Sequence, residues 1–314
     1  MSRFAVELVV GGPIGAVAGE QGSHHTGPGK EIKEINDKII NAKSNTASVL
    51  NQPGFHNNVV AGVPLEAQAL IWDVFFASRG RGLDIHTHFP WIDDSRNVHC
   101  ITVTERGCGE LVATLVLRGS VSDKIGRYAM IGMVCVDELW RRLGLSRQLM
   151  ETALSFAAEQ HINSLLLWTE QPSVYRRYGF LPDNRDGFGS VALNPLRPPS
   201  RITFVRRHAD AARGLPPFGR GLTRFESDAA EVIGVETAKG VTLAEWRGPM
   251  PSVLDLVESA LPATWRLNTS VGAPIFDEIS KRGHFYTALP GATRMVRHLY
   301  KPVDVPYVSV LDRI

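Results

Sequence analysis

Residues 131–160 read IGMVCVDELWRRLGLSRQLMETALSFAAEQ, and the rest of the chain is best interpreted outward from this stretch. An apolar run typical of a buried strand is followed by a short basic turn and then by a helical pattern. In the helical part, apolar residues recur on one face at Leu145, Leu149, Ala153 and Phe156. The stretch therefore predicts a strand, a tight turn and the beginning of a helix.

The turn has the features of an anion-binding site. The first N–H groups of a helix have no acceptors within the helix, and the helix dipole adds positive potential there. Gly144 has no Cβ and lets a ligand approach the backbone, while Arg141 and Arg142 can pair with phosphate oxygens. An arginine pair of this kind could also be a solvated helix start. We expect a phosphorylated ligand at this turn.

Length and composition describe a soluble globular protein with room for two domains. The chain has 314 residues, and ordinary domains have roughly 100–200 residues. Hydrophobic residues make up 44% and charged residues 21% of the chain. The net charge of +2, from 34 basic and 32 acidic residues, disfavours nucleic acid as the main partner.

Membrane insertion, export and metal binding are also disfavoured. No run approaches the ~18 consecutive apolar residues of a transmembrane helix, and Glu7 and Pro13 interrupt the apolar start that a signal peptide would need. The three cysteines lack CxxC spacing, which argues against a disulfide framework or a zinc site. His24 and His25 have no further ligands at metal-site spacing. A reducing cytoplasm fits best, with no metal.

From residue 54 onward, the pattern alternates between strands and helices. Pro64 is suited to the start of a helix, and the glycine-bearing residues 105–109 between two β-branched runs indicate a hairpin. A short helix ends at Gly179, which is suited to the left-handed position after a helix. The predicted strands are residues 58–63, 98–104, 111–117, 128–136, 164–168 and 201–205, the last within a proline-rich link.

The last hundred residues repeat this order and indicate a diverged internal duplication. In the second copy, residues 247–251 read RGPMP where the first copy has its basic turn. Two prolines remove backbone donors where a phosphate would need them. We expect that the second copy has lost phosphate binding and that the active site lies in the first half. The predicted elements are strands 241–246, 264–267 and 295–299 and helices 252–261 and 274–282.

Taken together, two motifs resemble the GNAT superfamily of acyl-CoA-dependent N-acyltransferases. The first motif is residues 141–146, RRLGLS, between a strand and a helix, and the second is residues 175–180, YRRYGF, after the next strand. The resemblance implies an α/β fold with a mixed central sheet flanked by helices, followed by a second, diverged GNAT-like domain. It divides the chain into an N-terminal extension 1–53, a catalytic domain 54–190, a link 191–222 and a degenerate domain 223–314.

The resemblance also implies a site and a reaction. In this family, an acetyl or related acyl group passes from coenzyme A to an amine, here most simply the amine of a small molecule. The pantetheine arm would follow the strand before the turn, and the pyrophosphate would sit on the turn. A tyrosine at the position of Tyr175 commonly protonates the leaving thiolate. The implied cofactor-binding residues are Val134, Cys135, Val136, Arg141, Arg142, Leu143, Gly144, Leu145 and Ser146.

Other roles remain open at the level of sequence. Candidate bases are Glu170 and Asp137, each at the end of a strand, or a histidine of residues 86–99. Tyr175 could instead be a packing residue, and Cys135 is better suited to a small buried position than to nucleophilic attack.

The acceptor side is less defined. His86 and His88 would face the same side of an extended segment, and Trp91 could line a pocket beside them. They could equally be solvated loop residues. The second copy could cover the acceptor or provide a homodimer surface. Two rival functions are a non-catalytic acyl-CoA-binding regulator and an acyltransferase with a different donor.

Overall fold

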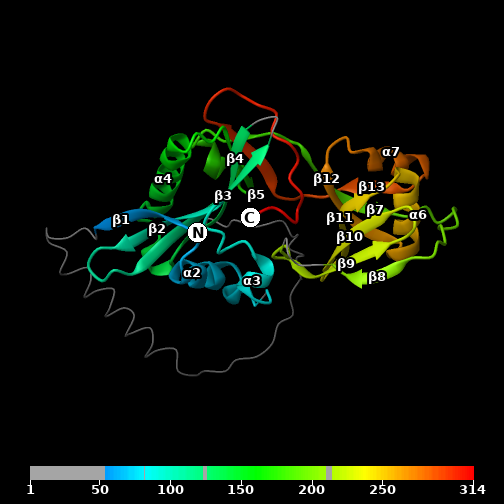
Figure 1. Cartoon of the computed structure of the whole chain (residues 1–314), viewed down its shortest axis with the longest axis horizontal. Helices are drawn as coiled ribbons and strands as arrows, with labels where there is room; N and C mark the ends of the chain where they lie inside the picture. The colour runs from blue at the N-terminus through cyan, green and yellow to red at the C-terminus, as the bar shows by residue number, and fades with distance from the viewer. Residues whose placement is uncertain (1–53, 81, 123–125, 210–213) are drawn as a thin grey trace, which may run out of the picture.

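The computed structural model describes residues 54–80, 82–122, 126–209 and 214–314, which form two sheets of seven strands each. The two sheets and their helices form separate lobes that lie next to one another (Figure 1). The predicted N-terminal extension 1–53, with its His24–His25 pair, lies outside the described residues. No helix among those that the structure describes is long and apolar enough to cross a membrane.

The first sheet has the strand order β1-β2-β3-β4-β5-β14-β6. Its neighbours are antiparallel except for β4 and β5, which are parallel and joined by a helix. Such a crossover is expected, because parallel neighbours cannot be joined by a tight turn. The strands are β1 (Phe55–Ala61), β2 (Val98–Glu105), β3 (Leu111–Ser122), β4 (Gly126–Val136), β5 (Ser164–Thr169), β14 (Thr293–His298) and β6 (Leu181–Pro182).

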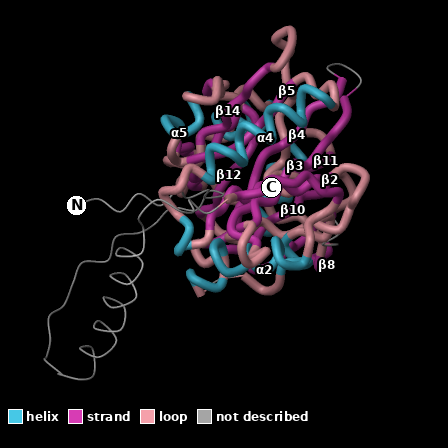
Figure 2. The backbone as a smooth tube through the Cα atoms, turned by 90° about the vertical axis from the view of Figure 1, so that its left-hand side faces the viewer, coloured by secondary structure: helices cyan, strands magenta, loops and turns pink. Residues whose placement is uncertain are grey.

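Helices cover the first sheet on both faces. The long helix α4 (Leu145–Glu159) and helix α2 (Leu65–Phe75) lie on opposite sides of it in both ribbon views (Figures 1 and 2). Because both faces are covered, the central strands read as nearly continuous apolar runs, and all six residues of β5 are buried. The remaining helical turns are η1 (Ala77–Arg79), α3 (Ile85–His88), η2 (Glu138–Trp140) and α5 (Pro172–Arg176).

The second sheet has the order β13-β7-β12-β11-β10-β9-β8, and β11 and β12 are its parallel pair. Helices α6 (Met250–Ala260) and α7 (Pro274–Lys281) pack together and enclose a separate core. The strands are β13 (Phe285–Ala288), β7 (Asp186–Ala192), β12 (Thr264–Ser270), β11 (Gly240–Arg247), β10 (Glu231–Thr237), β9 (Gly219–Glu226) and β8 (Val205–His208).

The two halves exchange one strand each. β7, which follows the first half in sequence, pairs with β12 of the second sheet. β14, from the end of the chain, pairs with β5 of the first sheet over six residues. The prediction that residues 295–299 close the second sheet is therefore wrong, because alternation identifies a strand but not the sheet that it joins. Strands of each sheet come from both sides of residues 191–222.

Two further local predictions differ from the structure. Residues 201–204 are not a strand, because Ser200 and Ile202 bond to side chains of α6, and the strand β8 begins only at residue 205. His86 and His88 lie on the short helix α3 instead of an extended segment, since the Asp84 carboxylate accepts a hydrogen bond from the Thr87 amide and caps that helix.

Candidate functional site

Strands β4 and β5 separate toward the ends at which the basic turn and α5 begin. Their parallel pairing extends only from Tyr128 opposite Ser164 to Met130 opposite Leu166. Beyond it, β4 contains a bulge with Met133 at φ 51°, where one extra residue lies opposite β3. Bulges that terminate pairing are frequent beside active sites. The two strands therefore open a space next to β4 instead of continuing their ladder.

The turn between β4 and α4 leaves its backbone accessible. Gly144 has φ 79°, and a Cβ built on it would meet no atom within 4 Å. No side chain caps the N-terminus of α4, so the N–H groups of Leu145 and Ser146 point toward the turn without an intrahelical acceptor. The predicted anion site thus has the local geometry that phosphate binding requires.

The side chains of the turn are also exposed. Arg141 lies 3.7 Å from Glu138 Oε1, and its Nε donates weakly to the Val136 carbonyl at 3.4 Å. Arg142 adopts φ 69°, which is uncommon for a residue with a Cβ. Leu143 is 47% exposed beside them. A basic, partly apolar surface surrounds the free N–H groups.

Tyr175 lies on α5, directly after β5, and is 3% exposed. Its hydroxyl has no hydrogen-bond partner among the described residues. Burial raises the pKa of this phenol above its ordinary value. A buried hydroxyl without a partner is costly, so its persistence calls for an explanation such as a bound ligand.

The predicted cofactor strand is a buried part of the first core. Val134 and Cys135 are 3% and 4% exposed, and Val136 is half-buried. Burial raises the pKa of the Cys135 thiol, which keeps it protonated and unsuited to nucleophilic attack. The neighbouring Cys100 thiol, whose pKa burial raises to about 11, lies 2.9 Å from the Thr114 hydroxyl.

The two predicted carboxylate bases have different surroundings. Asp137 caps the turn η2, since its Oδ1 accepts a hydrogen bond from the Leu139 amide at 2.9 Å. Glu170 follows β5 directly and is exposed. Asp137 therefore has a structural role at the end of β4, and Glu170 is an exposed residue at the end of β5.

The histidine-bearing segment belongs to the other side of the first sheet. His88 is 2% exposed, and its two ring nitrogens contact the Leu215 carbonyl at 2.8 Å and the Leu83 amide at 3.1 Å. His86 is exposed, because positions two apart on a helix face opposite sides. Its Nδ1 lies 3.6 Å from Asp93 Oδ2. Trp91 is buried in the core beneath the guanidinium of Arg118. The structure does not bring the three into one pocket.

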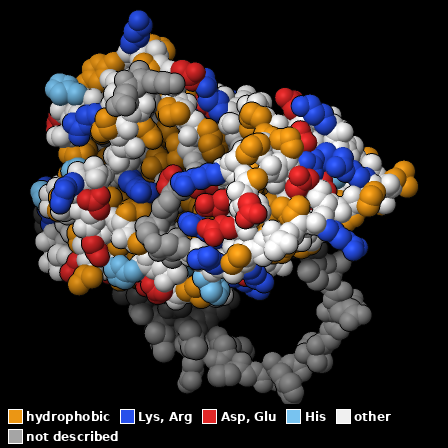
Figure 3. Space-filling view, turned by 45° about the vertical axis from the view of Figure 1, so that its right-hand side comes forward, with side chains coloured by type: hydrophobic (Ala, Val, Ile, Leu, Met, Phe, Trp, Pro, Cys, Tyr) orange, Lys and Arg blue, Asp and Glu red, His pale blue; other side chains and the backbone are white. Residues whose placement is uncertain are grey.

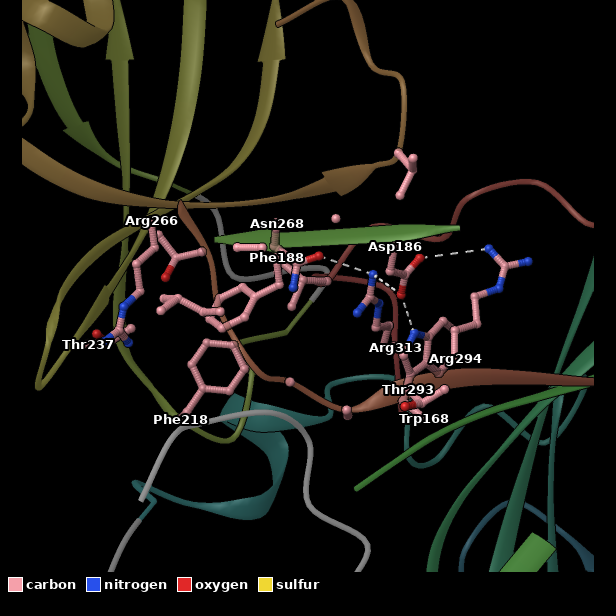
Figure 4. Close-up of a pocket in the computed structure, with 18 of the residues that line it drawn as sticks. Trp168, Asp186, Phe188, Phe218, Thr237, Arg266, Asn268, Thr293, Arg294 and Arg313 are labelled. Atoms are coloured by element: carbon pink, nitrogen blue, oxygen red, sulfur yellow. Dashed lines mark hydrogen bonds and ion pairs between the residues drawn. The ribbon is translucent and has the colours of Figure 1, made fainter. Parts of the chain in front are cut away.

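A pocket of about 580 Å³ lies between the two lobes and was not among the sequence predictions. Trp168 of β5 and residues of β7, β12, β14 and the last segment of the chain line it (Figure 4). A Cβ on Gly132 of β4 would lie 2.6 Å from Ile314, another lining residue. Ile314 therefore lies between the pocket and β4, while Trp168, which lies beyond the last β4–β5 pair, brings the pocket to the β5 side of the separated strands. The sequence feature that could have indicated this pocket is the presence of charged residues within apolar strands, such as Arg266 and Arg294.

Comparison with known proteins agrees with this geometry. Residues 65–180 match the acetyltransferase (GNAT) family. The chain contains a GNAT acetyltransferase domain. The matched region covers β4, the basic turn, α4 and Tyr175, and the second lobe has the same mixed, helix-flanked arrangement. The prediction of tandem GNAT-like domains is confirmed. A search of curated proteins gives no match.

Solved structures share the GNAT fold over most of the chain. A probable N-acyltransferase from Enterococcus faecalis V583 is 13% identical with a TM-score of 0.56, covering 78% of this chain and 73% of that one. A GCN5-related N-acetyltransferase from Kribbella flavida is 14% identical with a TM-score of 0.53, covering 78% and 71%. Eis1 from Mycobacterium abscessus is 12% identical with a TM-score of 0.50, covering 77% and 73%. Likeness at this identity concerns the fold.

Among the described residues, no group of three or more His, Cys, Asp or Glu side chains is placed to hold a metal ion.

Proposed function

We propose that the protein transfers an acetyl or related acyl group from acyl-coenzyme A to the amine of a small molecule. The observation that carries the proposal is the open GNAT turn at Gly144 together with the unpartnered, buried hydroxyl of Tyr175. The turn offers N–H groups and arginines to the pyrophosphate. The separated edge of β4 offers its main chain to the pantetheine arm.

In the proposed reaction, the acceptor nitrogen attacks the thioester carbonyl and a C–N bond replaces the C–S bond. The acceptor ammonium first loses one proton to a base or to water and then attacks as the neutral amine. The departing thiolate takes the phenolic proton of Tyr175, and the second proton lost by the nitrogen restores the phenol through solvent. A phenol with its ordinary pKa of about 10 is already protonated at neutral pH and can donate to the developing thiolate. Burial raises the pKa of Tyr175, which keeps the phenol protonated until the thiolate forms beside it. Glu170 at the end of β5 and Asp137 at the end of β4 remain the candidate bases.

Two glycines provide a matched test of the donor site. Gly144 and Gly272 have φ values of 79° and 78°, and at neither would an added Cβ meet an atom within 4 Å. Alanine at either position has the same left-handed strain, about 1–2 kcal/mol. Only Gly144→Ala places a methyl group at the proposed phosphate site. Thermal unfolding with and without coenzyme A, and thiol release from acetyl-coenzyme A over a panel of amines, measure the outcome.

We expect both variants to lose similar stability, whereas only Gly144→Ala loses protection by coenzyme A. An equal response of the two variants to coenzyme A would reject the turn as the donor site. Protection without thiol release on any amine would favour a non-catalytic acyl-CoA-binding protein. Absence of protection in the unmodified protein would favour a different donor.

A further inference from the structure

The pocket between the lobes is lined by more basic than acidic side chains. Its lining includes Lys239, Arg266, Arg294 and Arg313 but a single acidic residue, Asp186. Asp186 is already paired, because its Oδ2 lies 2.9 Å from Arg313 Nη2. On the face of the molecule shown in Figure 3, by contrast, acidic and basic side chains are interspersed. The excess of basic side chains in the lining thus differs from the mixture of charges on that face.

The far end of the pocket carries an arginine without a counterion. Arg266, on β12, extends toward Thr237, away from Trp168 and Asp186 (Figure 4). It is half-buried, and among the described residues it has no ion-pair partner within 4 Å. A partly desolvated guanidinium in a pocket favours an anionic ligand, since five donors are available there.

The near end of the pocket adjoins the separated strands. Trp168 of β5 donates its ring N–H to Asp186 at 2.5 Å, and the Arg313 guanidinium lies over its ring. Arg294 is fully buried and pairs with Asp183 at 3.0 Å, so it is a fixed part of the wall. This end is occupied by mutual ion pairs, whereas Arg266 at the far end has no ion-pair partner among the described residues.

The middle of the pocket is apolar. Phe188 and Phe218 lie between Arg266 and the Asp186 end (Figure 4), and Tyr286 also lines the pocket. A volume of about 580 Å³ suits a small organic molecule with its own apolar body. The pocket thus has three parts, which are a polar end with paired charges, an aromatic middle and the Arg266 guanidinium at the far end.

We propose that this pocket binds the acceptor, and that the acceptor is an amine with an anionic group, carboxylate or phosphate, at the opposite end of an apolar body. Arg266 binds the anionic group, the aromatic side chains hold the body, and the amine lies toward Trp168 and β4. The inference rests on the proposed acyl transfer. It also gives the second lobe a function, since β12 supplies the residue that selects the acceptor.

Four amines with one ring and different far ends test this inference. They are 4-(aminomethyl)benzoate, 4-(aminomethyl)phenylphosphonate, benzylamine and 1,4-bis(aminomethyl)benzene. Thiol release from acetyl-coenzyme A gives kcat and KM, and calorimetry without the donor measures binding of each compound. The variants are Arg266→Gln, Arg266→Glu and, as a control outside the pocket, the exposed Arg197→Gln.

We expect the two anionic amines to exceed benzylamine by about tenfold or more in kcat/KM, as one charge-assisted contact allows. Arg266→Gln removes the advantage of the anionic amines by raising their KM, with little change in kcat. Arg266→Glu shifts the preference to the diamine. Arg197→Gln changes neither the kinetic constants nor the preference. Of the two anionic amines, the one that binds tighter identifies the anion.

Equal turnover of benzylamine and the anionic amines, or an unaltered preference in Arg266→Gln, would overturn the inference. Failure of the proposed function is distinguishable, since no amine would then release thiol. In that case, tighter calorimetric binding of the anionic amines, lost in Arg266→Gln, still supports the pocket's selectivity, and its absence refutes it.

Discussion

The two strand–turn–helix units of the molecule have the same order of elements, but the backbone of the turn is accessible only in the first. Between β4 and α4, an added Cβ on Gly144 meets open space. Between β11 and α6, an added Cβ on Gly248 would lie 2.4 Å from the Ala229 carbonyl, and Pro249 and Pro251 lack N–H groups. The first turn is open and its backbone N–H donors are available, whereas neighbouring residues of the protein occupy the space at the second turn.

The buried polar side chains of the two lobes differ in the same way. In the first unit, the Tyr175 hydroxyl is buried without a partner. In the second, Glu258 accepts hydrogen bonds from Arg282 at 2.8 Å and from the Ser200 amide at 2.8 Å, and it lies 2.9 Å from His284 Nε2. Burial alone would raise the pKa of Glu258, but these hydrogen bonds outweigh it and lower the pKa to about 2. The comparison indicates that the first unit keeps polar groups for a ligand and the second uses them for stability.

Removal of the unpartnered hydroxyl should have the largest effect on activity. Tyr175→Phe deletes the proposed acid, and general acid catalysis contributes about 10²–10⁴-fold to rate. We expect kcat for thiol release to fall by that order. The free energy of unfolding should not decrease, because no hydrogen bond in the protein is lost. Steady-state kinetics and urea denaturation of the same preparation measure both quantities.

Tyr178→Phe is the control, since Tyr178 lies on the same segment and its ring contacts the Arg177 guanidinium. It should retain activity. A Tyr175→Phe enzyme with unchanged kcat, or one that loses stability as a hydrogen-bonded tyrosine would, contradicts the assignment of Tyr175 as the acid.

The open turn could be predicted from sequence because its causes are local. Gly144, the adjacent arginines and the helical periodicity all lie within one short stretch. The prolines at 249 and 251 likewise indicated that the second turn lacks backbone donors. The predicted strands of both units were also found, apart from residues 201–205, because apolar alternation is a property of each strand alone.

The arrangement of distant segments could not be predicted in this way. The burial of His88 depends on the Leu215 carbonyl, 127 residues away in the chain. The pairing of β14 with β5 and of β7 with β12 depends on which edges are vacant after each lobe folds. The pocket at Arg266 results from that exchange, so no local pattern marks it.

Disruption of the paired cluster should have the largest effect on stability. Arg282→Met leaves Glu258, Asp255 and Glu278 without their shared cation, and breaking a buried ion pair from one side costs about 3–5 kcal/mol. Urea denaturation should show this loss, while coenzyme A binding at the first turn is retained in the folded protein. The adjacent, exposed Lys281→Met should stay within about ±0.5 kcal/mol of the unmodified protein. A loss in Arg282→Met no larger than in Lys281→Met would mean that the second unit does not depend on this cluster.

The smallest expected effect is a difference in coenzyme A affinity between a variant of the first turn and a variant of the second. Arg142 and Arg247 are both exposed. Arg142 lies in the turn after β4, and Arg247 is the last residue of β11, directly before the second turn. Arg142→Gln removes one charge from the open turn, and we expect coenzyme A to bind about tenfold more weakly, equivalent to ~1.4 kcal/mol. The difference should shrink as salt is added, because exposed charges are screened. Arg247→Gln, at the closed turn, should leave the affinity unchanged at every salt concentration. Calorimetric titration of coenzyme A at low and high salt checks both variants, and equal weakening by the two substitutions would show that general surface charge, not the open turn, holds the ligand.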